Sequence, residues 1–267
     1  MSVQTLYTAA TGMSSMETKL NVIANNLANI ETTGFKRDRV NFEDLFYDHQ
    51  HMPGTEDQSG QRAPVGIQIG LGTNIVATQS DFSQGGFKQT GNQLDVVIEG
   101  RGFFQVMDPS GEIYYTRAGN FIRNRDGNLA LASSNVGRLL EPPITIPPDA
   151  TDISISAEGI VAVRQPGSQE MTQVGTIELA SFVNPEGLLK LGDNLYAQSD
   201  ASGTPTLSSP GQDGVGLLRQ GVLEASNVEP VTELIDLITT QRAFEMNSQV
   251  IKTADDLLQT VANLRRY

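Results

Sequence analysis

The chain contains no cysteine and no tryptophan among its 267 residues, and it contains only two histidines. The absence of cysteine excludes disulfide bonds, thiolate metal sites and a cysteine nucleophile. Both histidines, His49 and His51, lie in one polar stretch, so a catalytic triad has no candidate base elsewhere. Aromatic residues make up 6% of the chain. This small number of large rings disfavours a carbohydrate-binding surface.

Basic residues and long apolar runs are also scarce. The chain has 18 Lys and Arg against 31 Asp and Glu, a formal net charge of −13. Nucleic-acid binding normally needs a basic face, and an acidic surface is disfavoured at anionic membranes, so we expect neither partner. No run reaches the ~20 apolar residues of a membrane helix. The start of the chain lacks the basic and apolar regions of a Sec-type signal, so any export is expected to use another signal.

Both ends of the chain repeat apolar residues at spacings of three and four. The first segment has a column made of Leu6, Met13, Leu20 and Leu27. The last segment has a column made of Leu237, Phe244, Ile251 and Leu258. This spacing is typical of helices that pack along a left-handed seam. We predict one helix over residues 2–32, a second from about residue 228 to the end, and coiled-coil pairing between them.

The second helix has more apolar residues than one seam requires. A further column flanks the first and consists of Ala243, Val250, Leu257 and Leu264. An apolar face of this width is expected to contact more than one partner helix. The remaining surface is expected to be covered by neighbouring copies of the chain.

Local signals mark where the two helices end and begin. Gly34 is expected to adopt the left-handed conformation that ends the first helix, with Phe35 folding back on the last turn. Ser226 or Asn227 is expected to act as the N-cap of the second helix. Pro230 then falls in its first turn, where proline is tolerated.

The middle of the chain is rich in turn residues and alternating apolar residues, which predicts a compact, mainly antiparallel β domain. Before it, the alternation from Val65 to Leu71 predicts a half-buried strand, which turns at residues 72–74 and pairs with residues 75–78. The polar residues 48–64 are expected to form a mobile loop or the tip of an extended hairpin. The predicted fold is α+β, with residues 1–35 and 227–267 helical, 36–82 a hairpin or connector, and 83–226 the β domain.

Four asparagines between residues 21 and 29 stand out, because asparagine is a poor residue for a helix interior. Asn21, Asn25 and Asn29 recur at steps of four and form a polar stripe. Amide side chains both donate and accept hydrogen bonds, so the stripe is expected to fix the register of neighbouring helices. The alternative is a solvated helix face.

These residues resemble the N-terminal pattern of the bacterial flagellar rod and hook proteins, which runs here from Asn21 to Lys36. The C-terminal pattern agrees and comprises Ser226–Val228, Glu233–Leu234, Gln241–Phe244 and Asn247–Ser248. In the middle, the segments that resemble the distal-rod members of this family are residues 66–73, 95–106 and 115–117. The resemblance extends over essentially the whole chain.

The resemblance implies a structural role without a cofactor or metal. In this family the terminal helices pair as a coiled coil at the inside of a hollow helical assembly. The distal rod transmits torque from the motor to the hook, and its channel passes export substrates. The implied partners are other copies of the chain, proximal rod proteins, the hook protein, the P and L ring proteins and the flagellar export apparatus. The implied location is the basal body, where the rod crosses the periplasm after export without a cleaved signal.

The residues expected at the assembly interface are those of the apolar columns and of the family patterns. They are Leu6, Met13, Leu20, Asn21, Asn25, Asn26, Leu27, Asn29, Gly34, Phe35, Asn227, Gln241, Arg242, Phe244, Asn247, Ile251 and Leu258. The hairpin region 48–80 is expected to contact subunits along the shaft, the alternative being a surface loop without contacts.

Other functions receive less support. Another axial protein, either proximal rod or hook, is the nearest alternative. A peptidoglycan-acting enzyme would need a paired acid and base, and an exported β-type adhesin is a further class. The pair His49 and His51 lacks a third ligand for a metal. The glycines between residues 66 and 72 lack the Lys-Ser/Thr of a phosphate loop.

Overall fold

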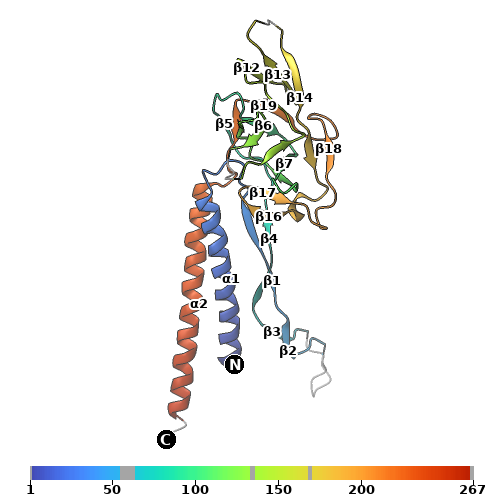
Figure 1. Ribbon diagram of the computed structural model, residues 1–267. Coiled ribbons are helices and arrows are strands. Elements are labelled where there is room, and N and C mark those ends of the chain that lie inside the picture. The colour runs from blue at the N-terminus through green and yellow to red at the C-terminus, as the bar shows by residue number, and fades with distance from the viewer. Residues whose placement is uncertain (1, 55–63, 133–135, 168–169, 265–267) are drawn as a thin grey trace. The chain divides into compact units, whose positions relative to one another are not determined.

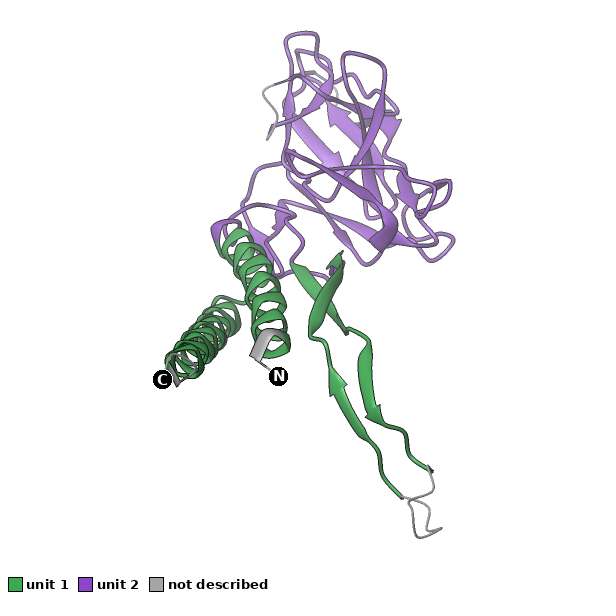
Figure 2. Cartoon of the chain, turned by 90° about the horizontal axis from the view of Figure 1, so that it is seen from below, with its two compact units in different colours: residues 1–27, 38–79, 229–267 green, residues 28–37, 80–228 purple. Residues whose placement is uncertain are grey.

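The structure, a computed structural model, describes residues 2–54, 64–132, 136–167 and 170–264 (Figure 1). The chain divides into two compact units (Figure 2). Unit 1 comprises residues 1–27, 38–79 and 229–267, and unit 2 comprises residues 28–37 and 80–228. Each unit therefore combines segments that are far apart in the sequence.

Unit 1 contains two long helices, α1 (Ser2–Ala28) and α2 (Pro230–Leu264), which confirms the predicted helical ends. They lie side by side and run in opposite directions (Figures 1 and 2). At ~1.5 Å per residue they are roughly 40 and 52 Å long. Ala9, Ile23 and Ala254 are buried. Coiled-coil pairing in the strict sense stays a prediction.

Both helices are shorter than expected where they meet the rest of the chain. The predicted first helix continued to residue 32, but α1 ends at Ala28, and the N–H of Thr32 donates to the carbonyl of Asn29 at 3.2 Å in a separate turn. Neither Ser226 nor Asn227 caps the second helix, because α2 begins at Pro230. Proline tolerates this first position because its missing N–H has no acceptor there.

Gly34 adopts the predicted left-handed conformation, with φ of 69°, but it does not end α1. Its N–H donates to the carbonyl of Glu224 at 2.9 Å. A Cβ at this position would lie 2.7 Å from the backbone nitrogen of Ala118. Gly34 is therefore required by a close approach of three backbone segments within unit 2.

A long hairpin completes unit 1. Strand β1 (Asp38–Asp44) pairs with β4 (Thr73–Ser80), and β2 (Tyr47–His51) pairs with β3 (Ile67–Gly70). The N–H of Leu45 donates to Gly72, and that of Leu71 donates to Phe46, so the two ladders are continuous. The expected pairing of β3 with residues 75–78 is wrong because the chain does not reverse at Gly72.

The expected burial of the hairpin strand is also wrong. Val65 is 79% exposed and Ile67 is 51% exposed, so alternation here does not reflect a half-buried strand. Of the predicted loop or tip at residues 48–64, residues 55–63 lie outside the described part of the chain.

Unit 2 is built from antiparallel strands, as predicted for the middle of the chain. Among the described residues, the largest sheet has nine strands. Its main path is β16 (Leu189–Gly192), β17 (Leu195–Ala197), β8 (Ile113–Thr116), β7 (Phe103–Met107), β11 (Leu139–Glu141), β10 (Leu129–Leu131) and β9 (Phe121–Arg123). From this path, β7 also pairs with β15 (Leu179–Ser181), which pairs with β18 (Thr206–Ser208).

Smaller sheets and one short 3₁₀ helix surround this sheet in unit 2. One sheet contains β12 (Asp152–Ile155), β13 (Ile160–Arg164) and β14 (Thr172–Thr176). A second pairs β6 (Val96–Glu99) with β19 (Leu217–Gln220), and a third pairs β5 (Phe87–Gln89) with β20 (Val222–Glu224). The 3₁₀ helix is η1 (Pro185–Gly187). A turn at Asp108–Gly111 connects β7 to β8, and a turn at Ala157–Gly159 connects β12 to β13.

The core of unit 2 has two parts. The larger part packs β-branched and leucine side chains around Phe104 and Phe121, whose rings meet edge to face at 5.1 Å. The smaller part is aromatic: Phe103, Tyr115 and Phe182 are buried together with Tyr196. Edge-to-face pairs of this kind add about 0.5–1.5 kcal/mol beyond burial of their area.

Replacing Gly34 by alanine tests the close backbone approach. The control is Gly91→Ala, because Gly91 also has a positive φ of 74° but has no atom within 4 Å of its Cβ position. We expect Gly91→Ala to lower the free energy of unfolding by about 1–2 kcal/mol. Gly34→Ala should cost about 2 kcal/mol more, because backbone must move. Urea unfolding followed by tyrosine fluorescence measures both, and equal losses would contradict the account.

Candidate assembly interface

Asn26 is the one predicted interface asparagine that is fully buried, at 1% exposure, and it joins three elements of unit 1. Its Nδ2 donates to the carbonyl of Asp38 at 2.8 Å and to Oε2 of Glu233 at 3.3 Å. Its Oδ1 accepts from the N–H of Asp38 at 3.0 Å. Asn26 on α1 therefore binds both the start of β1 and the first turn of α2. An apolar residue here would leave these groups without their amide partner.

The rest of the asparagine stripe lies elsewhere. Asn21 and Asn25 have exposed side chains on α1. Asn29 follows α1 and accepts a hydrogen bond from the hydroxyl of Thr32 at 3.1 Å. A contact of this stripe with neighbouring helices stays a prediction.

The face between α1 and α2 combines apolar and polar residues. The predicted apolar column residues are half-buried in unit 1; they are Leu6, Met13, Leu20, Leu27, Phe244, Ile251 and Leu258. Ser15, Glu233 and Thr240 are buried at 4%, 3% and 2% exposure. Asn247 is half-buried, and its Nδ2 lies 3.0 Å from the Cβ position of Gly12. The two helices therefore approach closely at Gly12 and Asn247.

The outer face of α2 is apolar and exposed. Its large side chains, between 41% and 66% exposed, are Val231, Leu234, Ile235, Ile238, Met246, Val250, Leu257 and Val261. Of the predicted flanking column, Val250 and Leu257 belong to this face, whereas Ala243 is half-buried and the side chain of Leu264 is outside the described residues. Gln241 and Arg242 are also exposed, and Arg242 pairs with Glu245 at 3.0 Å. Exposed apolar patches of this kind mark interaction surfaces.

A cluster of three buried charges lies in unit 2. The family patterns contain two of its residues, Lys36 and Arg117, but did not indicate that they meet Glu224. Lys36 and Glu224 are both fully buried, and Lys36 Nζ lies 2.7 Å from Glu224 Oε1. Lys36 also donates to the carbonyl of Ser83 at 2.7 Å, and Glu224 Oε1 accepts from the N–H of Gly85 at 3.0 Å. Arg117, 4% exposed, places Nη1 3.6 Å from Glu224 Oε2. We call Lys36, Arg117 and Glu224 the charge cluster.

The charge cluster contains two cations and one carboxylate. Burial lowers the pKa of Lys36, although the attraction of Glu224 opposes this shift. Burial likewise lowers the pKa of Arg117, again against the attraction of Glu224. The guanidinium lies over the ring of Phe103, 5.3 Å from its centroid. This contact with the ring face stabilises the guanidinium. It does not replace a second carboxylate, and one carboxylate does not balance two buried cations.

Asn227 and Phe35, both predicted interface residues, make contacts within unit 2. Asn227 Oδ1 accepts from the N–H of Arg37 at 2.7 Å, and its Nδ2 donates to the carbonyl of Asp81 at 2.8 Å. The Phe35 ring lies 5.2 Å from Lys190 Nζ. Asn227 therefore acts inside unit 2 rather than as a helix cap. These hydrogen bonds join Asn227 to residues far away in the sequence, so no pattern near Asn227 could predict them.

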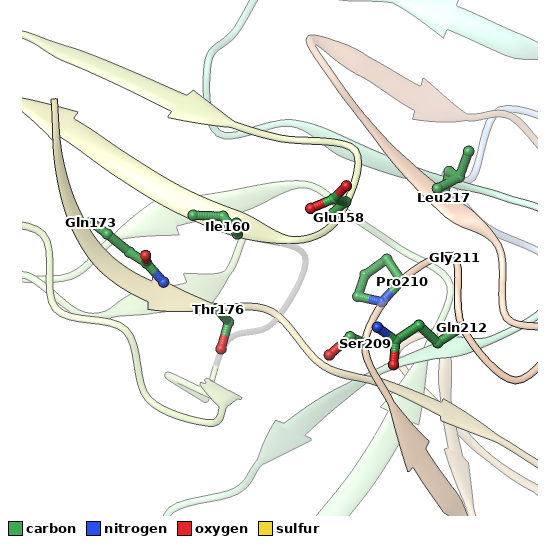
Figure 3. Close-up of a pocket in the computed structure, with 9 residues that line it drawn as sticks. All are labelled: Glu158, Ile160, Gln173, Thr176, Ser209, Pro210, Gly211, Gln212 and Leu217. Carbon is green, nitrogen blue, oxygen red and sulfur yellow. The ribbon is translucent and has the colours of Figure 1, made fainter.

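A surface cavity of about 490 Å³ lies between β13, β14 and the 209–212 loop of unit 2 (Figure 3). The lining combines amides, hydroxyls and apolar groups, and Glu158 is the one ionisable residue among the nine that line it. A paired acid and base would need a second such group, so this cavity gives no support to hydrolytic chemistry.

Two further observations concern metal ligands and membrane-spanning helices. Within the described residues, no group of three or more His, Asp or Glu side chains is arranged to hold a metal ion, and His49 and His51 are exposed on β2. Among the helices described, none combines the length and apolar character needed to cross a membrane.

Comparisons with known proteins place these features in a family. Residues 6–36 match the model of the flagella basal body rod proteins. Residues 97–163 match that of the flagellar hook protein FlgE/F/G D1 domain. Residues 219–264 match that of the flagellar basal body rod FlgEFG protein C-terminal region.

Individual relatives match over nearly the whole chain. The flagellar basal-body rod protein FlgG of Caulobacter vibrioides is 45% identical over 264 residues, covering 98% of this chain and 100% of the relative. FlgG of Borreliella burgdorferi is 42% identical over 266 residues, covering 99% of each chain. The flagellar hook protein FlgE of Salmonella typhimurium is 25% identical over 416 residues, covering 96% of this chain and 99% of the relative.

Paired terminal helices with an apolar outer face, together with these matches at both ends and in the middle, define an axial protein of the bacterial flagellum. Within this class, the chain belongs to the family of flagellar basal-body rod proteins FlgG. It is a structural subunit of the basal body rather than an enzyme.

Two substitutions in the charge cluster test its charge balance. Glu224→Gln removes the only carboxylate and leaves two buried cations, so we expect a loss of about 3–5 kcal/mol in the free energy of unfolding. Lys36→Met leaves one cation with one carboxylate, so the loss should be smaller, about 2 kcal/mol or less. Urea unfolding at neutral pH compares the two. A larger loss for Lys36→Met than for Glu224→Gln would contradict the presence of two buried cations around one carboxylate.

Proposed function

We propose that the chain builds the distal rod, a hollow helical shaft that transmits torque from the motor to the hook and passes export substrates. Identity of 41–45% to several FlgG proteins, against 25% to a hook protein, supports the rod over the hook. The observation that carries the proposal is the outer face of α2, which stays exposed after α2 has packed against α1. A monomeric protein has little reason to expose a long apolar face on a helix whose other face is already packed.

In this proposal α1 and α2 pair as a coiled coil, and neighbouring copies cover the outer face of α2. The predicted interface residues on these helices then act in two ways. The half-buried column residues hold α1 to α2, while Asn21, Asn25, Gln241 and Arg242 are exposed and available to other copies. The proposed domains keep the predicted division into residues 1–35 with 227–267 (helical), 36–82 (hairpin) and 83–226 (β), except that residues 28–37, 80–82 and 227–228 belong to unit 2.

The hairpin of unit 1 is proposed to contact subunits along the shaft. Its apolar side chains are open to solvent: Phe46 is 87% exposed, Met52 62% and Val65 79%. A two-stranded ribbon is marginally stable by itself, so contacts with another copy would also hold its shape. Such contacts would stiffen the shaft against bending.

The remaining partners and the location follow from the family resemblance alone. They are the proximal rod proteins, the hook protein, the P and L ring proteins and the flagellar export apparatus. The proposed subunit reaches the periplasmic part of the basal body without a cleaved signal.

Electron microscopy of the purified full-length chain at rising concentration tests the proposed function. We expect straight, hollow filaments above a threshold concentration, because burial of the apolar α2 face between copies offsets the entropic and ordering costs of association. Curved filaments would favour the hook, and a monomer at every concentration would overturn the proposal.

Polar substitutions on the outer face of α2 test which surface drives assembly. The double variant Ile238→Gln and Leu257→Gln should keep the helical content of the monomer, because both side chains are exposed, at 56% and 66%. Burial of a large aliphatic side chain contributes about 2 kcal/mol, so the threshold concentration should rise by roughly two orders of magnitude or more.

The matched control is Lys252→Gln, which changes an exposed polar position of the same helix and should leave the threshold within about twofold. Light scattering against concentration gives all three thresholds. Assembly of the double variant at the wild-type threshold would show that the outer face of α2 lies outside the subunit contacts.

A further inference from the structure

A second cavity of unit 2, with a volume of about 450 Å³, lies next to the charge cluster. Its wall includes Arg117 and the rings of Phe103 and Phe182, which are 4%, 2% and 7% exposed. Ser83 and Ser181 add hydroxyl groups to the lining. The inner part of this cavity is therefore aromatic and carries one buried cation.

Arg117 has unused hydrogen-bonding capacity. Among the residues that the structure describes, its buried Nε and Nη1 have no acceptor, and Glu224 Oε2 accepts no hydrogen bond. The distance of 3.6 Å between Nη1 and Oε2 brings their charges together without a hydrogen bond. The better-placed oxygen of Glu224 is already used by Lys36 and by the N–H of Gly85. A buried guanidinium without acceptors is costly, since five N–H groups normally find partners.

The acidic residues of the cavity are engaged elsewhere or exposed. Asp81 accepts from the N–H of Ser83 at 2.9 Å, and Asp213 accepts from the hydroxyl of Ser208 at 3.0 Å. Asp213 and Glu186 are exposed, as is the second cation of the lining, Arg101. The exposed part of the cavity thus has mixed charge, and only the buried part has an unbalanced positive charge.

We propose that this cavity binds a carboxylate side chain from a second copy of the chain, which supplies the missing acceptor for Arg117. This inference rests on the proposed function, because it needs copies packed side by side. The chain carries 31 acidic residues against 18 basic ones, so carboxylates are the commonest charged groups that a neighbouring copy can present. A guanidinium N–H donates a charge-assisted hydrogen bond to a carboxylate, so one carboxylate oxygen in the cavity would satisfy a donor that now lacks an acceptor.

The threshold concentration for assembly of the full-length chain tests the inference. Arg117→Met keeps most of the side-chain length and removes the charge, so the carboxylate loses its partner. We expect the threshold to rise at least about tenfold. The control Arg219→Met removes an exposed arginine that pairs with Glu99 outside the cavity, and should stay within about twofold of the wild type. The variant should remain folded, because an apolar residue often replaces a buried charge without loss of stability.

Normal assembly of a folded Arg117→Met variant would overturn the inference and leave the proposed function intact. Failure of the wild-type chain to assemble would overturn both. If Arg117→Met does not fold, Ser181→Cys provides a second test, because the chain has no other cysteine. Reaction of this thiol with a maleimide should slow at least about tenfold above the assembly threshold. An equal rate in monomer and filament would overturn the inference.

Discussion

The charge cluster is the constraint on which the arrangement of unit 2 depends, because it joins the beginning and the end of that unit. Lys36 and Glu224 are 188 residues apart in sequence and 2.7 Å apart in space. Closing a loop of that length costs roughly 5 kcal/mol of chain entropy. One ion pair does not offset this cost. The hydrogen bonds from Gly34 to Glu224 and from Arg37 to Asn227 close the same loop, so all of these contacts share the cost.

In unit 1, the long helix α2 has two different faces, one against α1 and one exposed. The face between α1 and α2 contains buried polar groups, among them Asn26, Glu233 and Thr240, which fix how the helices meet. The face of α2 with the most exposed apolar area points away from this contact. Polar groups at a seam specify register, whereas a wide apolar face adds affinity. The polar groups between α1 and α2 therefore fix how the two helices pair, and the exposed apolar face of α2 is suited to contact with other copies of the chain.

How much of this could be predicted from the sequence depends on the range of the interactions. The helical ends follow from the repeat of Leu6, Met13 and Leu20, a signal that extends over many turns. The antiparallel middle follows from turn residues such as Asp108 to Gly111. The pairing of β3 with β2 could not be predicted, because the local alternation at Ile67 and Ile69 is the same whichever strand is the partner. The roles of Gly34, Asn227 and Glu224 depend on contacts across more than a hundred residues, and no local pattern encodes them.

Native-state hydrogen exchange in the full-length monomer tests the central claim most directly. The amide N–H groups of Gly34 and Arg37 donate across the closed loop, to Glu224 and Asn227. If the charge cluster holds the two ends of unit 2 together, these amides should exchange only through global opening, with the same free energy as the core amide of Phe104. Exchange of Gly34 and Arg37 at a free energy several kcal/mol below that of Phe104 would contradict the account, because the ends would then open while the β core stays closed.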